Sequence, residues 1–166
     1  LGVFHGCSGF TGSLIIPNSV TLIETGAFYD CSGFTGPLTI PNSVKTIGNS
    51  AFENCSGFTG PLTIPDSVKE IGDEAFKGCS GLTGSLTIGS SMGNSYWGIG
   101  KNVFDGCNFT NIISKAQIAP TLNSYINDNT NIVYVPSGTR ESYESAWNEY
   151  GYTFIEYDRE DYHFNG

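Results

Sequence analysis

Positive charge is scarce in this chain of 166 residues. Seven Lys and Arg residues stand against sixteen Asp and Glu residues, which gives a formal net charge of −9 at pH 7. Nucleic-acid phosphates and anionic membrane surfaces both attract clustered Lys and Arg. The composition therefore argues against a nucleic acid as the partner. No apolar run approaches the roughly 20 residues of a membrane span, so we expect no membrane insertion of this segment.

Patterns that would carry catalysis or bind a metal are also missing. The five cysteines contain no short pair such as C-x₂-C, which a zinc site would need. The two histidines, His5 and His163, suggest no Ser-His-Asp or Cys-His arrangement. Gly98-Ile99-Gly100 lacks the third glycine of a dinucleotide fingerprint. We therefore expect no enzyme, no cofactor and no metal site.

What the chain has in abundance is repetition. Residues 31–54 and 55–78 agree at 18 of 24 positions, and all six differences exchange polar residues or glycine. Such a period indicates stacked structural repeats with a shared buried skeleton and a variable surface. The cysteines mark the period, with three gaps of 24 residues and a last gap of 28: Cys7, Cys31, Cys55, Cys79 and Cys107.

Each repeat predicts two short extended stretches and a corner. Leu38-Thr39-Ile40 alternates as a half-buried strand does, and Val44 and Ile47 frame the second stretch. Ala51-Phe52 is expected to pass through one helical or 3₁₀ turn into the next cysteine. Stacking places equal positions about 4.8 Å apart. The predicted ladders are Leu14, Leu38, Leu62, Leu86; Ile16, Ile40, Ile64, Ile88; Ile23, Ile47, Ile71, Ile99; and Phe4, Phe28, Phe52, Phe76, Phe104.

The cysteine ladder has a packing interpretation and a bridging one. Stacked thiols lie close enough for disulfides, but five is an odd number and stacked side chains point in parallel. Buried free cysteine behaves as a small apolar residue. We therefore expect five reduced thiols in the core, beside the stacked phenylalanines.

The pattern CSGFTGPLTIPNSVKTIGNSAFENC resembles the BspA-like class of bacterial leucine-rich repeats, with I-P-x-S-V, I-G and A-F-x-x-C in register over residues 1 to about 112. The resemblance implies a β-rich solenoid of leucine-rich-repeat type, with short parallel strands and 3₁₀ or helical turns. It also implies a bacterial surface protein of the adhesin kind. Two departures are the 24-residue length of the turns and the altered fourth turn, at Gly89, Met92 and a four-residue insertion.

Residues 113–166 lose the period and predict a small α+β module that caps the solenoid of residues 1–112. Residues 131–136 read as a strand and Thr139 as a helix N-cap. Tyr143, Ala146, Trp147 and Tyr150 lie on one helix face. Gly151 ends the helix, and residues 152–155 form a last strand. This module is also similar to the closing module of many BspA-like proteins, with V-P-x-G followed by Y-x-x-A.

The start of the chain predicts an open end. Gly2-Val3-Phe4 matches Gly26-Ala27-Phe28, the last quarter of a repeat, and neither a methionine nor a signal peptide precedes it. We expect a fragment that lacks upstream turns. An uncapped first turn would expose its apolar ladder and favour end-to-end self-association.

The insertion in the fourth turn carries Tyr96 and Trp97 between small residues. Insertions in solenoids map to one face, often the binding face, and Tyr and Trp are common interface anchors. The alternative is that Trp97 folds back into the groove above the cap. The segment 127–131 resembles a calcium loop only faintly, and a connecting loop is the simpler interpretation.

These observations predict a non-enzymatic, extracellular or cell-surface interaction module whose ligand is a protein or a glycan. Adhesion or host-protein binding is the leading hypothesis; a structural spacer and a carbohydrate-binding accessory module are the alternatives. Binding is expected on shallow rows of outward side chains and on the insertion. The candidates are Thr39, Thr63 and Thr87 beside Ile15; Lys45 and Lys69 beside Thr21, with Leu22, Thr46 and Glu70 adjacent; and Tyr96 and Trp97.

Overall fold

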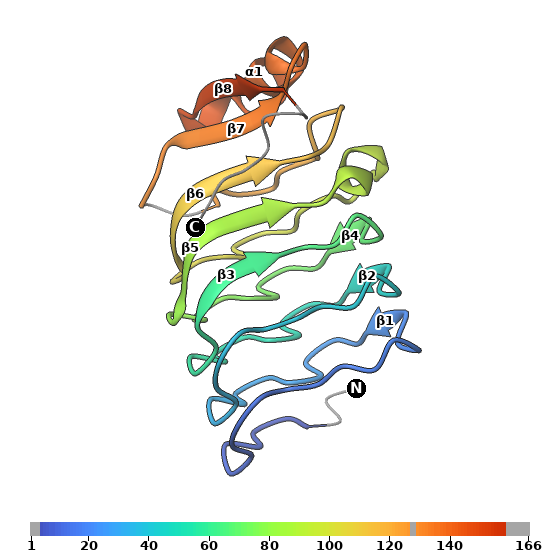
Figure 1. The fold of residues 1–166 in the computed structure, drawn as a ribbon, viewed down its shortest axis with the longest axis vertical. Coiled ribbons are helices and arrows are strands. Elements are labelled where there is room, and N and C mark those ends of the chain that lie inside the picture. Colours follow the sequence, from blue (N-terminus) through green and yellow to red (C-terminus); the bar gives the residue numbers. More distant parts are fainter. Residues whose placement is uncertain (1–3, 127–128, 159–166) are drawn as a thin grey trace.

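The computed structural model describes residues 4–126 and 129–158, which form a stack of turns along one axis (Figure 1). One sheet contains β1 (Leu22–Ile23), β2 (Thr46–Ile47) and β4 (Glu70–Ile71). The second has the order β3-β5-β6-β7-β8 and is formed by β3 (Gly60–Thr63), β5 (Leu82–Ile88), β6 (Asn108–Ser114), β7 (Ile132–Pro136) and β8 (Thr153–Tyr157).

The 24-residue period of the sequence becomes the register of the first sheet. Leu22 pairs with Thr46 and Thr46 with Glu70, in parallel, so equal positions of successive turns lie side by side. All the strand pairs of both sheets are parallel. The expected leucine-rich-repeat-like fold with parallel strands is therefore confirmed. The prediction of a strand at residues 38–40 is wrong. The second sheet begins with β3, which is one repeat later in the chain.

The corners of the repeats are single turns with hydrogen bonds between residues i and i+3, and they do not extend into helices. The amide of Glu53 donates to the carbonyl of Ser50 at 3.2 Å, and the amide of Cys55 to that of Phe52 at 3.1 Å. Ser50 and Asn54 have φ values of 51° and 62°. A right-handed helix cannot continue through a positive φ, so the expected corner is present as single turns with bonds between residues i and i+3, and no longer helix forms.

The core runs the length of the stack. The rings of Phe28, Phe52, Phe76 and Phe104 stack with centroids 5.2–5.6 Å apart and nearly parallel planes. A second stack, which the sequence analysis did not identify, joins Phe10, Phe34 and Phe58 at 5.8–6.2 Å. Its signal was present, because these residues are also 24 positions apart.

Side chains become more exposed toward the first described turn, because that turn packs against a described turn on one side only. Phe28 and Cys7 are half-buried, against the expectation that all members of their ladders are buried. Ile15 in this turn is 84% exposed, and Phe4, Phe10 and Leu22 are also exposed. The interior members of the two ladders are buried: Cys31, Cys55, Cys79, Cys107, Phe52, Phe76 and Phe104.

All five cysteines are free thiols, and four of them have a role beyond filling space. Each donates to the main-chain carbonyl of a phenylalanine in the preceding turn, Cys55 to Phe28 and Cys79 to Phe52, both at 3.0 Å. Cys31 and Cys107 bond to Phe4 and Phe76 in the same way. The thiols therefore tie each turn to the one before it.

The last segment extends the second sheet with β7 and β8. Helix α1 (Arg140–Ala146) places Tyr143 in the core, and Trp147, which follows directly, is fully buried too. The indole Nε1 of Trp147 donates to the carbonyl of Pro120 at 2.8 Å. Ala146 is exposed, contrary to expectation, because the helix ends there and η2 (Asn148–Tyr150) follows. Gly151 ends that element with a φ of 69°.

Thr139 stands at the expected N-cap position but bonds differently. Its hydroxyl donates to the carbonyl of Pro136 at 2.6 Å, while the amide of Arg140 donates to Glu156 Oε1 at 3.1 Å. Glu156 of β8 therefore satisfies the helix end that Thr139 was expected to cap. The proposed boundary between residues 112 and 113 lies inside β6, and its role as a domain boundary stays a prediction. No helix among the described residues is long and apolar enough to span a membrane.

Candidate functional site

The insertion of the fourth turn presents two aromatic side chains to solvent. It begins with a short 3₁₀ helix, η1 (Ser90–Asn94), in which Met92 is fully buried. Tyr96 is 85% exposed and Trp97 65% exposed, and their rings meet edge to face with centroids 5.3 Å apart. Met92 occupies the buried position, so the alternative in which Trp97 plugs the fold is wrong.

The backbone around Trp97 is held from both sides. Its amide donates to Ser95 Oγ at 3.3 Å, and its carbonyl accepts from Asn123 Nδ2 at 3.4 Å. Gly98 has a φ of 55° and lies so close to Thr121 that a Cβ atom would overlap its carbonyl oxygen. The loop is thus fixed to the next turn while its aromatic rings stay free of the core, which limits the ordering cost on binding.

Trp97 borders an open depression of about 390 Å³ at the exposed side of β4. A second depression of about 440 Å³ adjoins it and continues past β2 and β1. We call the two together the Trp97 groove. Its first part is lined by Asn49, Glu70, Ile71, Gly72, Asp73, Trp97, Gly100, Lys101 and Asn123, and its second by Leu22, Glu24, Thr25, Thr46, Ile47, Gly48, Asn49, Glu70 and Gly72.

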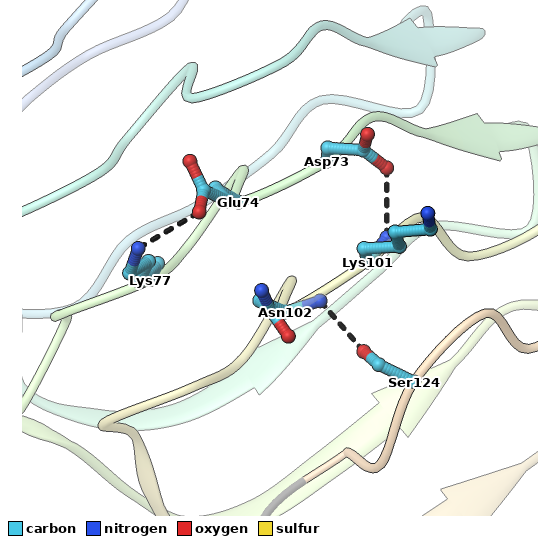
Figure 2. Close-up of polar contacts among 6 residues, drawn as sticks. All are labelled: Asp73, Glu74, Lys77, Lys101, Asn102 and Ser124. Atoms are coloured by element: carbon cyan, nitrogen blue, oxygen red, sulfur yellow. Dashed lines mark hydrogen bonds and ion pairs between the residues drawn. The ribbon is translucent and has the colours of Figure 1, made fainter.

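A chain of carboxylate and amide oxygens lines the groove from turn to turn. Asn49 Oδ1 accepts from the amide of Asp73 at 3.0 Å, and Asp73 Oδ1 accepts from the amide of Lys101 at 2.7 Å. Figure 2 shows the other carboxylate oxygen of Asp73 pointing away from this amide. The same view shows Ser124 Oγ accepting from the amide of Asn102 at 2.6 Å, one turn further on. One Asp73 oxygen therefore orders the groove while the other faces outward.

The hydrogen bonds that the Asn49 and Asp73 side chains accept from the next turn were not predicted from the sequence, although the sequence contains a signal for them. The exchange of Asn49 for Asp73 between repeats looked like variation of an exposed surface. Both residues supply an oxygen at the same place, and both can accept the amide of the next turn. Asp66 does the same for Ser90, at 2.9 Å. The exchange of Asn for Asp between residues 31–54 and 55–78 keeps a side-chain oxygen that accepts the amide of the next turn.

The structure brings some of the predicted binding residues together and separates others. Thr39 and Thr63 are exposed and Thr87 is half-buried, and none of the three lines the Trp97 groove. Lys45 and Lys69 are exposed and do not line it either. The adjacent row does, through Leu22, Thr46 and Glu70. The sequence identified both rows but not which of them lies beside Trp97, because the path of the insertion decides that.

The corner beside the groove carries a row of side chains at one repeat position that differ in charge and burial from turn to turn. His5 stacks on Tyr29 with centroids 4.7 Å apart. Glu53, one repeat on, is buried. Lys77 Nζ pairs with Glu74 Oε1 at 2.8 Å, and this hydrogen bond raises the pKa of Lys77 (Figure 2). His163 lies outside the described residues.

The described residues offer binding groups rather than reactive ones. No group of three or more His, Cys, Asp or Glu side chains in residues 4–126 and 129–158 could hold a metal ion. Burial raises the pKa of Cys55 and Cys107 to about 12, so these thiols stay protonated and poorly nucleophilic. Asn127 and Asp128 of the candidate calcium loop lie outside the described residues. The adjoining Asn129 side chain donates to the carbonyl of Cys107 at 3.3 Å.

Comparison with known proteins identifies a repeat family and a matching solved structure. The family model for the BspA type leucine-rich repeat region, in six copies, matches residues 2–132 and 61–156. A solved structure of a leucine-rich cell surface protein from Faecalibacterium prausnitzii A2-165 is similar at 22% identity with a TM-score of 0.40. The match covers 90% of this chain and 40% of that one, so the chain spans less than half of that protein's length. No curated protein matches.

Proposed function

Since the chain belongs to the BspA type leucine-rich repeat family, we propose that it is a non-enzymatic binding module that holds its ligand in the Trp97 groove. The observation that carries the proposal is the exposure of Tyr96 and Trp97 beside an open groove with both polar and apolar lining. Large aromatic side chains in water are unfavourable unless a partner covers them. Tyr and Trp also dominate the binding free energy of many interfaces.

The groove suits an extended ligand. It passes three turns of the stack, from Leu22 through Thr46 to Glu70, before it reaches Trp97. Each turn offers a few polar groups and a small apolar surface, so affinity per turn is modest. The aromatic pair at one end supplies the anchor. The rows of Thr39 and Thr63 and of Lys45 and Lys69 would add contacts only for a ligand that extends beyond the groove.

The module acts outside the cell in this proposal, on the surface of a bacterium or secreted from it, and its binding serves adhesion. The segment from residue 113 onward closes the stack. Support comes from Tyr143 and Trp147, two large side chains of this segment that are fully buried. At the other end, exposed Ile15 and Leu22 border an apolar opening, so self-association through the first turn is part of the proposal.

The experiment is a binding screen with a matched pair of variants. The chain is tested against extracellular-matrix proteins and polysaccharides, beside the double variant Tyr96→Ala/Trp97→Ala and the control Ile15→Ala. The double variant is expected to lose about 2 kcal/mol or more of binding free energy with its melting temperature almost unchanged. Equal binding by the double variant would refute the groove as the site. Absence of any binder would favour the structural spacer instead.

Light scattering over a concentration series tests the self-association separately. The chain is expected to form larger species as concentration rises, and Ile15→Lys to suppress them because a charge would be desolvated in the contact. Strictly monomeric behaviour of the unmodified chain would refute this part of the proposal.

A further inference from the structure

We infer that the ligand of the Trp97 groove is a carbohydrate chain, with one sugar ring stacked on Trp97 and its hydroxyls bonded to the side chains around it. The inference rests on the proposed function and names its ligand class. It joins three observations: an exposed indole held on a fixed backbone, a ring of polar side chains beside it, and a sheet whose backbone groups are already paired.

The chemistry of the depression matches a pyranose. A sugar ring has a face of C–H groups, which packs on an aromatic face, and a rim of hydroxyls that both donate and accept hydrogen bonds. Trp97 supplies the aromatic surface. Glu70 and Asp73 supply carboxylate acceptors, and Lys101 supplies a donor. The amide nitrogen of Asn123 already donates to the carbonyls of Trp97 and Ile99, so Asn123 offers its side-chain oxygen as a further acceptor. A sugar hydroxyl can donate to a carboxylate and can also accept from an ammonium group. One sugar ring can therefore bond to acidic and basic side chains of the site at the same time.

An extended peptide fits this groove less well. A peptide strand binds a sheet chiefly through main-chain hydrogen bonds to a free edge. Along the groove those bonds are already made between turns: the amide of Gly48 donates to Ile23, that of Gly72 to Ile47, and that of Gly100 to Ile71, all at 2.8–2.9 Å. A ligand must therefore be recognised by side chains alone. That favours a polymer with a hydroxyl on nearly every atom of its rim.

The site is open and ordered before binding. Ser95 and Asn123 hold the Trp97 backbone, and Asp73 is held by its bond to the Lys101 amide. A depression of about 390 Å³ that is open to solvent accommodates internal rings of a chain, not only a chain end. We therefore expect chains of several rings to bind more tightly than a single sugar, as contacts add along the neighbouring turns.

Tryptophan fluorescence is the direct readout. The chain has two tryptophans, and Trp147 is buried, so a sugar stacked on Trp97 shifts the emission of the exposed one. The probes are hexasaccharides of glucose, N-acetylglucosamine, mannose and xylose, with calorimetry for affinity, and gelatin as an extended protein. At least one hexasaccharide is expected to bind. Trp97→Ala and Asp73→Asn are each expected to weaken it at least tenfold, with Ile15→Ala unchanged.

Asp73→Asn is a sharp test because Asn49 occupies the same position one turn earlier and makes the same bond. The variant keeps the fold and changes the charge of the outward oxygen. Binding of gelatin through Trp97 with no response to any sugar would overturn the carbohydrate inference and leave the proposed function standing. Sugar binding that survives Trp97→Ala would overturn both. Failure of every probe to bind would also overturn both.

Discussion

The Cys55 thiol lies 3.0 Å from the main-chain carbonyl oxygen of Phe28, 27 residues earlier, and donates a hydrogen bond to it. The same bond recurs at three other turns. A residue that marks the repeat in the sequence therefore also connects consecutive repeats. A thiol suits the position because it is small and weakly polar, so it fills the core and still satisfies a buried carbonyl.

Thiol reactivity should follow this arrangement. In native buffer one of the five cysteines, the half-buried Cys7, is expected to react readily with a thiol reagent, and the four buried ones slowly. All five are expected to react after denaturation without reductant. Cys7→Ala should remove the fast phase alone. Fewer than five thiols under denaturing conditions would mean disulfides and would contradict the packing of the ladder.

Stability should fall at alkaline pH because of the same thiols. Burial raises the pKa of Cys55 from an ordinary value of 9.0 to about 12 in the folded chain. Above pH 9 the unfolded chain loses this proton and the folded chain keeps it, so stability falls as pH rises toward 12. At pH 10.5 the loss from Cys55 is about 2 kcal/mol.

Urea unfolding at pH 8 and pH 10.5 measures the effect. Cys55→Ser removes the titrating group and keeps a hydrogen-bond donor, so its stability should fall by about 2 kcal/mol less over this interval. Equal falls for the two proteins would mean that the Cys55 thiol does not contribute to the pH dependence.

Close stacking of the turns depends on glycine at one repeat position. A Cβ atom on Gly57 would overlap the carbonyl oxygen of Phe34, and Gly33 and Gly81 have the same environment. Gly57→Ala is expected to destabilise the fold by about 3 kcal/mol or more, since backbone atoms would have to separate. Gly9, the equivalent residue of the first turn, has no atom within 4 Å of its Cβ position.

Gly9→Ala therefore serves as the matched control and should change the stability by at most about 0.5 kcal/mol. Thermal and urea unfolding of both variants provide the comparison. Similar costs at the two positions would show that glycine is required there for a reason other than contact between turns.

Tyr143 should stabilise the last segment through its hydroxyl. This group donates to the carbonyl of Ala116 at 2.9 Å and lies 2.6 Å from Ser114 Oγ, and its burial raises the pKa of Tyr143 well above the ordinary value. Tyr143→Phe removes both hydrogen bonds and leaves the buried Ala116 carbonyl without the hydroxyl that donates to it, so a loss of about 2 kcal/mol is expected. Tyr157→Phe, at a partly buried hydroxyl, should cost less.

Calorimetry of Tyr143→Phe also tests whether residues 113–158 unfold with the repeats. The hydroxyl bonds join α1 to the end of β6, where Ser114 pairs with Ile88 of β5, and so connect the last segment to the repeats. A single transition that shifts to lower temperature is expected. A separate early transition with the main one unchanged would show that the two parts unfold independently.

The sequence predicts the stack well because its determinants are local and repeated. A 24-residue period fixes which residues lie side by side, and glycine and apolar positions recur within it. The conformation of the corners was harder to predict from the sequence, because Ser50 and Asn54 have positive φ values, which are less common for these residues than for glycine. Glycine at Gly26 and Gly78, the equivalent positions of other repeats, was the available signal.

The groove could not be predicted from the sequence because it depends on how one insertion folds. The insertion showed that Tyr96 and Trp97 leave the repeat pattern. That Met92 is buried in their place, and that Asn123 of a later turn fixes the Trp97 backbone, depends on contacts between segments without periodicity. Those contacts place Trp97 beside Glu70 rather than beside the threonine row.

Chemical-shift mapping of a ¹⁵N-labelled chain with a hexasaccharide that binds tests the central claim most directly. We expect the largest changes at the Trp97 indole and at the amides of Asp73, Lys101 and Asn123, and little change at Thr39 and Thr63. Changes concentrated on the threonine row or on the first turn, with the Trp97 indole unaffected, would contradict the assignment of the groove as the binding site.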